Sequence, residues 1–230
     1  MTCEYIIRVE NLRTYFFTEE GVVKAVDGVS LGIRRGRVLC IVGESGSGKS
    51  VLARSMLRLI DPPGKIVSGR IIYSENGRDI DLAALPENHP MIRKVRGGVI
   101  GYVFQEPFSA FSPVHTIGDQ IAEAIVTHCG RLERREMVRR MIALLESVGI
   151  REAEKMLGKF AWELSGGQRQ RAMIAMAMAA GPKILLADEP TTALDVTTQA
   201  QVITLLRSMV SLMDMSVVLI THDMGVVAEI

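Results

Sequence analysis

The chain has 230 residues, of which 48% are hydrophobic and 23% are charged, a composition typical of a globular domain and not of a disordered or fibrous protein. Its 27 lysine and arginine residues nearly balance 26 aspartate and glutamate residues, so the net charge of +1 gives no general attraction to nucleic acid or anionic lipid. The longest apolar stretch, Ala172 to Ala180, is too short to cross a bilayer, and the start of the chain lacks a secretory signal, so we expect a protein that stays in the cytoplasm.

Short runs rich in β-branched residues predict six strands. In chain order they are Val22–Val29, Val38–Val42, Ile71–Tyr73, Val99–Phe104, Ile184–Ala187 and Val217–Ile220. The second, fifth and sixth of these are apolar without alternation, as in strands of a parallel sheet that is covered on both faces. We expect these three strands to form the centre of the sheet.

Helical stretches alternate with these strands and predict an α/β fold. They are Ser50–Ile60, Ile117–Thr127, Glu133–Val148, Gly167–Ala180 and Thr197–Met213. The third is the clearest, because its apolar residues recur at helical spacing with charges between them. The region from Glu106 to Glu163 is predicted to be all-helical, like an insertion between two parts of one sheet. We therefore expect one domain, residues 1–230, with a helical subdomain at about 106–163.

The cysteines carry no motif. Cys3, Cys40 and Cys129 lie far apart and form no Cys-x-x-Cys pair. They indicate neither a zinc knuckle nor a disulfide framework, and we interpret them as buried or incidental thiols.

A glycine-rich segment directly follows the predicted strand 38–42 and directly precedes a helix. It reads Gly43-Glu44-Ser45-Gly46-Ser47-Gly48-Lys49-Ser50, followed by Val51, and fits the phosphate-loop pattern G-x-x-x-x-G-K-[ST]. Glycines let backbone N–H groups approach phosphates, and the helix directs its positive end at them. Lys49 would place a charge on the β and γ phosphates, and Ser50 would offer a hydroxyl to Mg²⁺.

The apolar strand at 184–187 ends in Asp188 and Glu189. A carboxylate there reaches the sheet edge where the phosphate loop also emerges, so we expect Asp188 to hold Mg²⁺. Glu189 is placed to accept a proton from an attacking water and is the candidate catalytic base. The alternative is that these acids only form a solvated turn.

Leu164-Ser-Gly-Gly-Gln168, together with the phosphate loop, the acidic strand end and His222, closely resembles the ATP-binding cassette of ABC transporters. The resemblance runs nearly from end to end. It implies a P-loop NTPase fold with a mostly parallel central sheet, an antiparallel N-terminal β-region and the inserted helical subdomain. It also implies an ATPase that uses ATP and Mg²⁺.

The resemblance assigns further residues to the site. By it, Gln105 is the Q-loop glutamine, which serves the metal and catalysis, and His222 is the catalytic switch histidine. Ala193-Leu-Asp195 is the D-loop, with Asp195 near the nucleotide. Tyr15 resembles the aromatic residue that stacks on adenine, although Phe16 is close enough to compete.

The signature segment has a physical rationale of its own. Ser165, Gly166 and Gly167, followed by Gln168, begin a helix and would present hydroxyl and amide donors to an anion. In the family this second phosphate cradle closes on the nucleotide that the other subunit holds. The resemblance therefore implies a second cassette as an ATP-dependent partner, identical or different, with two chains making two sites.

Cassettes of this kind also act in DNA repair and on the ribosome, and this remains the alternative function. The repair type inserts a long coiled coil or a zinc element between the Q-loop and the signature, whereas only 58 residues separate Gln105 from Leu164 here. The ribosome type carries two cassettes on one chain, but each motif occurs once in this sequence. We therefore expect a transporter subunit and no nucleic-acid partner.

Four segments resemble the dipeptide, oligopeptide and nickel importer branch. They are Gly21–Ser30, Phe104–Pro113, Thr116–Gln120 and Asp188–Thr197. Ala161-Trp162 departs from the branch, which commonly has Pro-His there. The chain also stops at Ile230, eight residues beyond His222, without the closing strands and C-terminal extension of the branch, so we expect a truncated cassette.

The branch implies a set of partners. Membrane permease subunits and an extracytoplasmic binding protein choose the cargo, so the substrate stays open among dipeptides, oligopeptides, nickel and others. The cassette would lie peripherally on the cytoplasmic face of the membrane. The segment Glu106–Pro113 would dock a short permease helix, with Phe108 and Phe111 as candidate anchors, unless these rings only pack under the loop.

Overall fold

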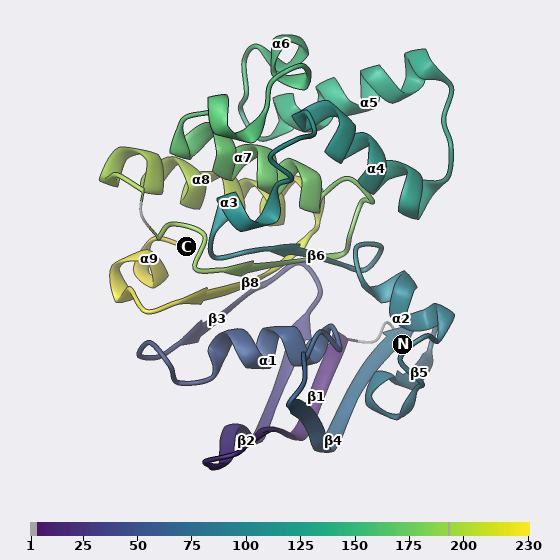
Figure 1. The fold of residues 1–230 in the computed structure, drawn as a ribbon, viewed down its shortest axis with the longest axis vertical. Helices are drawn as coiled ribbons and strands as arrows, with labels where there is room; N and C mark the ends of the chain where they lie inside the picture. Colours follow the sequence, from purple (N-terminus) through teal and green to yellow (C-terminus); the bar gives the residue numbers. More distant parts are fainter. Residues whose placement is uncertain (1–3, 193) are drawn as a thin grey trace.

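The computed structural model describes residues 4–192 and 194–230, so Cys3 and Ala193 of the predicted D-loop lie outside the described residues. Two four-stranded sheets are layered with helices between them and beyond them (Figure 1). One sheet is antiparallel and formed by the N-terminal part of the chain, and the other is parallel. The predicted fold class is confirmed.

The antiparallel sheet has the strand order β2-β1-β4-β5. Its strands are β1 (Tyr5–Thr18), β2 (Gly21–Arg34), β4 (Gly64–Glu75) and β5 (Arg78–Asp81). The sequence predicted parts of β2 and β4 and missed β1 and β5. In β1, charged residues on one face interrupt the apolar run. These charges are paired across the sheet, as between Arg8 and Asp79 at 2.7 Å, which makes an extended strand compatible with them.

The parallel sheet has the order β3-β8-β7-β6. Its strands are β3 (Val38–Val42), β6 (Ile100–Val103), β7 (Ile184–Asp188) and β8 (Ser216–Thr221). As predicted, β7 and β8 lie inside the sheet, and all their residues are buried. The prediction of a central β3 was wrong, because β3 lies at one edge with half-buried or exposed residues. An apolar run indicates whether both faces of a strand are covered. The order of the strands depends instead on the connections that cross from one strand to the next.

The five predicted helices are present, with small shifts of their ends. The α-helices are α1 (Lys49–Met56), α2 (Pro90–Val95), α3 (Pro107–Ala110), α4 (Ile117–Cys129), α5 (Arg134–Ser147), α6 (Ala153–Leu157), α7 (Gly166–Ala177), α8 (Val196–Met213) and α9 (Met224–Glu229), with 3-10 turns at Leu82–Ala84 and Ala161–Glu163. The first helix is shorter than predicted, because Arg58 takes a positive φ of 56° that ends it. Within the described residues, no helix is both long enough and apolar enough for a membrane span.

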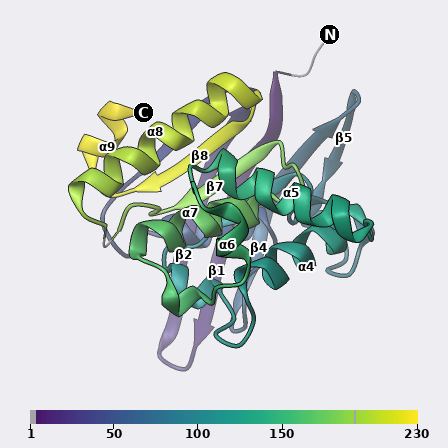
Figure 2. The same cartoon turned by 90° about the horizontal axis from the view of Figure 1, so that it is seen from above.

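Alternating residues of β7 and β8 divide the core into two layers. Leu186, Val218 and Ile220 pack with Leu52 and Met56 of α1, toward the antiparallel sheet. On the opposite face, residues such as Leu185 and Leu219 pack with α7 and α8. Figure 2 shows α8 and α9 at one side of this second layer and α4 and α5 at the other. The carboxyl ends of β3 and β7, which carry the predicted site, are therefore held in a sheet that is covered on both faces.

Two cysteines can be described. Cys40 on β3 is half-buried and Cys129 at the end of α4 is exposed, and both are free thiols. Burial raises the pKa of the Cys40 thiol. This agrees with the prediction of incidental thiols for these two positions.

Candidate active site

The phosphate loop connects β3 to α1, as predicted from the sequence. Gly48 directly precedes α1 with a φ of 90°, and a Cβ atom there would collide with the carbonyl oxygen of Ala25 on β2. Only glycine fits this close approach of two backbones. Lys49 is 8% exposed, and its Nζ donates hydrogen bonds to the carbonyl oxygens of Gly43 at 2.8 Å and Glu44 at 2.7 Å. The ammonium group is thus held inside the loop, where phosphate oxygens would replace the carbonyls as its acceptors.

The loop and the acidic strand end meet. Ser50 Oγ donates to Asp188 Oδ1 at 3.0 Å, although the two residues are 138 positions apart. Asp188 is only 2% exposed at the end of β7. A hydroxyl and a carboxylate are the oxygen donors that Mg²⁺ prefers beside nucleotide phosphates, so this pair fits the expected metal.

The predicted catalytic base has an unusual backbone. Glu189 has a φ of 46°, in the left-handed region that is strained for a residue with a side chain. Its N–H donates to the carbonyl oxygen of Ile220 on β8 at 2.9 Å, which holds the chain in place as it leaves the sheet.

Three side chains hold the Glu189 carboxylate. Gln105 Nε2 donates to Oε2 at 3.1 Å, and Thr192 Oγ1 donates to the same oxygen at 3.0 Å. His222 Nδ1 lies 3.2 Å from Oε1. The structure therefore brings together Glu189, predicted as the base from its place at the strand end, with Gln105 and His222, which the family resemblance assigned to catalysis. It adds Thr192, which was not predicted from the sequence. The Gln105 amide oxygen is not used in this contact and is the atom that could face a metal.

The signature segment caps α7. Ser165 Oγ accepts the N–H of Gln168 at 3.3 Å, and Gln168 Oε1 accepts the N–H of Ser165 at 3.2 Å. In this reciprocal cap the serine hydroxyl keeps its own proton for another acceptor. A Cβ atom on Gly167 would lie 2.6 Å from Thr198 Cγ2, so a side chain there would require Thr198 on α8 to shift.

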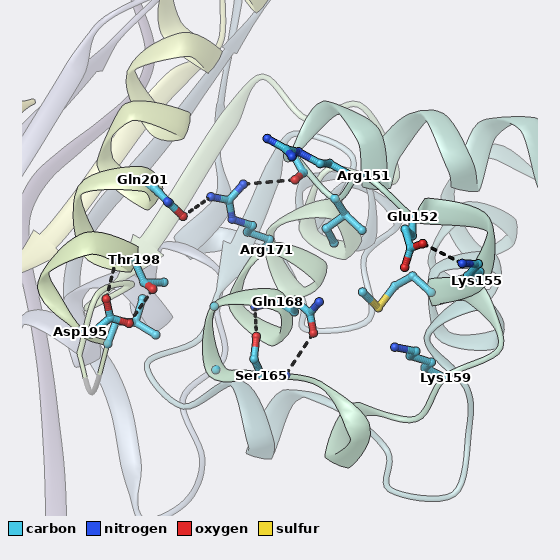
Figure 3. A pocket seen from close by; sticks show the side chains of 16 residues that line it. Arg151, Glu152, Lys155, Lys159, Ser165, Gln168, Arg171, Asp195, Thr198 and Gln201 are labelled. Atoms are coloured by element: carbon cyan, nitrogen blue, oxygen red, sulfur yellow. Dashed lines mark hydrogen bonds and ion pairs between the residues drawn. The ribbon is translucent and has the colours of Figure 1, made fainter.

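A pocket of about 690 Å³ opens in front of this cap (Figure 3). Ser165, Gly166 and Gly167 form one wall of the pocket. Lys159, Arg171 and Asp195 line its other walls. Asp195 is the N-cap of α8, because its two oxygens accept from Thr198 N and Thr198 Oγ1. This hydrogen bonding, led by the Thr198 side chain, lowers the pKa of the Asp195 carboxyl. Asp195 thus has a structural role at the start of α8 in addition to its predicted contact with the nucleotide.

The two phosphate-type cradles of the chain are separate. No residue of the loop at 43–50 lines the pocket in front of Ser165. Figure 1 shows α1 and α7, the helices that follow the two cradles, on opposite sides of the parallel sheet. One chain therefore does not bring both cradles to the same anion.

Tyr15 and Phe16 point to opposite faces of β1. The Tyr15 hydroxyl donates to Asp27 at 2.7 Å, and this hydrogen bond is the main reason why the Tyr15 pKa is raised. Phe16 shares the face of Thr14, whose hydroxyl is 2.8 Å from Ser55 Oγ on α1. The choice between Tyr15 and Phe16 as the stacking residue stays open, and Phe16 is the aromatic residue on the α1 side.

The two phenylalanines of the predicted docking segment differ. Phe108 is 62% exposed, as an anchor for a partner should be, whereas Phe111 is 5% exposed and belongs to the core. The prediction of Phe111 as an exposed anchor was wrong, because this ring packs under the loop. The guanidinium of Arg169 lies 3.4 Å from the centroid of the Phe108 ring.

The role of Tyr102 on β6 was not predicted from the sequence. Its hydroxyl donates to Asp188 Oδ2 at 2.8 Å, the oxygen that Ser50 does not contact. A polar residue within a strand that is otherwise apolar and leads into the Q-loop was the available signal. Its pairing with a residue 86 positions away could not be read from spacing.

Comparisons with known proteins identify the family. Residues 26–192 match the family model described as ABC transporter. The chain belongs to the ABC transporter family. It is 46% identical, over 98% of its length and 66% of the relative, to a probable peptide ABC transporter ATP-binding protein of Sinorhizobium fredii. It is 44% identical, over 97% of its length and 66% of the relative, to the oligopeptide transport ATP-binding protein AppD of Bacillus subtilis.

The chain is 43% identical to a third relative, the glutathione import ATP-binding protein GsiA of Escherichia coli, and it covers 36% of that relative's length. Among solved structures, a bacterial ABC transporter cassette described as dimeric, MJ0796, superposes with a TM-score of 0.83 at 30% identity over 97% of this chain and 90% of that one. The same cassette bound to ADP and Pi gives a TM-score of 0.83 at 28% identity.

These similarities decide between the expected functions. The chain is an ABC-type ATPase that binds ATP, and the relatives named above act in transport and not in DNA repair or on the ribosome. The chain spans about two thirds of the length of the first two relatives.

Proposed function

We propose that this chain is the ATP-hydrolysing subunit of a peptide importer, positioned on the cytoplasmic face of the membrane against permease subunits. The observation that carries the proposal is the cluster in which Ser50 contacts Asp188 at 3.0 Å while Gln105 and His222 hold Glu189. This cluster joins the phosphate loop to two strand-end carboxylates, the arrangement that ATP hydrolysis needs.

Each residue of the cluster has a separate task in the proposed reaction. Lys49 binds the β and γ phosphates, and Ser50, Asp188 and the Gln105 amide oxygen would hold Mg²⁺. The metal, when bound, neutralises the charge that develops on the phosphates. Glu189 takes the proton of the attacking water, and Gln105, Thr192 and His222 keep its carboxylate in place.

The second cradle acts on the nucleotide of another chain. Ser165 keeps a hydroxyl proton to donate, and the first amides of α7 have no partner within the helix. Because the loop at 43–50 does not reach this pocket, we infer that two cassettes pair head to tail with ATP between them. The dimeric state described for the similar cassette MJ0796 supports this arrangement.

Peptides are the proposed cargo. Relatives at 43–46% identity are described as peptide transporter, oligopeptide transport or glutathione import proteins, and all three descriptions name a peptide. The permease and an extracytoplasmic binding protein would select it. Nickel and other substrates of the branch have no support among the relatives named here.

Phe108 is the proposed contact with the permease. Its exposed ring lies under Arg169, whose Nε and Nη2 donate to the carbonyl oxygens of Ala161 at 2.9 Å and Leu164 at 2.7 Å. These carbonyls belong to the segment that leads into Ser165. A displacement of Phe108 by the permease would thus be transmitted through the Arg169 side chain to the signature segment.

Uptake in cells tests the proposal as a whole. Cells that lack the gene for this chain should take up a labelled peptide poorly, and the wild-type gene should restore uptake. Lys49→Ala should not restore it, because the triphosphate contact is lost. Restoration by Lys49→Ala would contradict the ATP-driven role, and unimpaired peptide uptake with impaired uptake of another solute would contradict the cargo.

A further inference from the structure

Asp188 is held from two sides, and only one of them belongs to the phosphate loop. Ser50 Oγ donates to Oδ1 at 3.0 Å, and the phenol of Tyr102 donates to Oδ2 at 2.8 Å. The carboxylate is almost fully buried, at 2% exposure. Each of its oxygens therefore has a named donor, and the phenol is the donor on the side away from the loop.

The sheet register places the phenol there. Tyr102 on β6 is the direct partner of Leu186 on β7, so both side chains project from the same face of the sheet. Asp188 lies two residues after Leu186 and projects from that face as well. This is the face that α1 covers, because Leu186 packs in one core with Leu52 and Tyr102 packs against that core.

The phenol is fixed in position by packing. Its ring packs edge-on against Phe104, with centroids 4.7 Å apart. A phenol carries its proton at neutral pH, so the hydroxyl acts as a donor to the carboxylate.

We propose that Tyr102 is a positioning residue for Mg²⁺: by holding Oδ2, it turns Oδ1 of Asp188 toward Ser50 and the metal. The proposal rests on the role of Asp188 proposed above and adds the group that sets its orientation. Without the phenol, the carboxylate can rotate about its terminal bond, and a buried oxygen is left without a donor. Partners of this kind, behind a metal ligand, typically change metal affinity by 10 to 100-fold.

Equilibrium binding of a fluorescent ATP analogue, titrated with MgCl₂, tests the proposal without relying on turnover. Tyr102→Phe keeps the ring and removes only the hydroxyl. We expect it to need about tenfold more Mg²⁺ for half-maximal enhancement of binding. Binding in EDTA should equal that of the wild-type chain, because the loop contacts with the phosphates are unchanged.

Tyr73→Phe is the matched control. Tyr73 is a buried tyrosine on β4 whose hydroxyl also donates to a carboxylate, Glu75 at 2.9 Å, but in the antiparallel sheet. This variant should show the Mg²⁺ requirement of the wild-type chain. An equal shift in both variants would attribute the effect to general loosening and overturn the proposal.

Asp188→Asn separates this inference from the proposed function. One outcome is that Mg²⁺ does not change nucleotide binding by the wild-type chain and that Asp188→Asn binds nucleotide as the wild-type chain does. In that case the metal role of Asp188 would be wrong, and Tyr102 would have no ligand to position. If Asp188→Asn removed the Mg²⁺ effect but Tyr102→Phe did not shift it, only the inference would fail.

A second measurement covers the case in which Tyr102→Phe does not fold. 3-Fluorotyrosine at position 102 of the otherwise wild-type chain reports on the phenol by ¹⁹F NMR. Its resonance should shift on addition of Mg-ATP and not on addition of ATP in EDTA. The same resonance position under both conditions would contradict the role of Tyr102.

Discussion

Glu189 combines a strained backbone with a carboxylate that three side chains hold. The φ of 46° is unfavourable for a residue with a side chain, and it persists because the Glu189 N–H is bonded to β8. Gln105, Thr192 and His222 then fix the carboxylate itself. Strain of this kind at a strand end is typical of a residue kept for its chemistry.

Glu189→Gln should therefore retain ATP binding and lose hydrolysis. The amide occupies the same space but cannot accept the proton of water, so we expect turnover to fall by about 10² to 10⁴-fold. Phosphate release and equilibrium binding of ATP measure the two properties separately. Glu154→Gln, at an exposed position of α6, is the control and should hydrolyse ATP normally. Wild-type turnover by Glu189→Gln would show that another group is the base.

The adenine contact can be assigned by two single substitutions. Phe16 shares the face of Thr14, which reaches α1, whereas the Tyr15 hydroxyl is engaged by Asp27. We expect Phe16→Ala to weaken ATP binding by about 5 to 150-fold, as for removal of a stacked ring worth about 1–3 kcal/mol. Tyr15→Ala should have less effect. The opposite order in a binding titration would restore Tyr15 as the stacking residue.

At the scale of single elements, helix α4 begins with a complete capping box. Thr116 Oγ1 accepts the N–H of Asp119 at 3.1 Å, and Asp119 Oδ2 accepts both the N–H and the hydroxyl of Thr116, at 3.2 and 2.7 Å. These hydrogen bonds, led by the Thr116 side chain, lower the Asp119 pKa. Local sequence alone supports such a cap, because its partners are three residues apart.

Thr116→Ala should reduce the free energy of unfolding by about 1 kcal/mol in urea denaturation near pH 7. A depressed carboxyl pKa stabilises the fold above the pKa of the unfolded chain, about 3.9, and this contribution is lost as the pH falls through the folded value. The difference between variant and wild type should thus narrow below about pH 4. Thr204→Ala, within α8 and exposed, is the control and should have little effect. A difference that did not change with pH would contradict the role of Asp119.

The short helix α3 carries one phenylalanine at the surface, and the residue directly after the helix is a phenylalanine in the core. Phe108 is exposed, whereas Phe111 is buried. Phe111→Ala should destabilise the chain by about 3–5 kcal/mol. Phe108→Ala should leave stability and ATP binding of the isolated chain nearly unchanged but impair transport in the assembled transporter. Normal transport with Phe108→Ala would contradict its permease contact, and strong destabilisation would make it a core residue.

On the scale of the whole molecule, the parallel sheet separates the two cradles. The loop at 43–50 precedes α1 on one side, and Ser165 precedes α7 on the other (Figure 1). Because the two do not meet within one chain, a nucleotide can join them only between two chains. ATP would then act as part of the interface.

The Glu189→Gln chain should therefore pair when Mg-ATP is added. It should behave as a monomer without nucleotide and as a dimer with it, because the bound nucleotide is not consumed. Light scattering after gel filtration measures the mass in both states. Adding Ser165→Arg should abolish pairing while ATP binding is retained. A dimer that does not depend on nucleotide, or a monomer in both states, would contradict ATP-bridged pairing.

The local features of this protein could be predicted from its sequence. The phosphate loop, the apolar strands β7 and β8 and the cap at Ser165 depend on residues close together in the chain, and each has a pattern set by backbone geometry. The strand β1 was missed because charged residues on one face interrupt its apolar run, and their pairing with other strands cannot be read from the sequence.

Which distant residues meet could not be predicted from the sequence, because it depends on how the strands and helices pack together. The contacts of Asp188 with Ser50 and Tyr102 span 138 and 86 residues, and the edge position of β3 follows from the order in which the strands pair. The burial of Phe111 beside an exposed Phe108 also depends on what packs over the loop. A periodic sequence pattern indicates which face of a helix or strand is buried. Which residues cover that face depends on how distant segments of the chain are connected and packed.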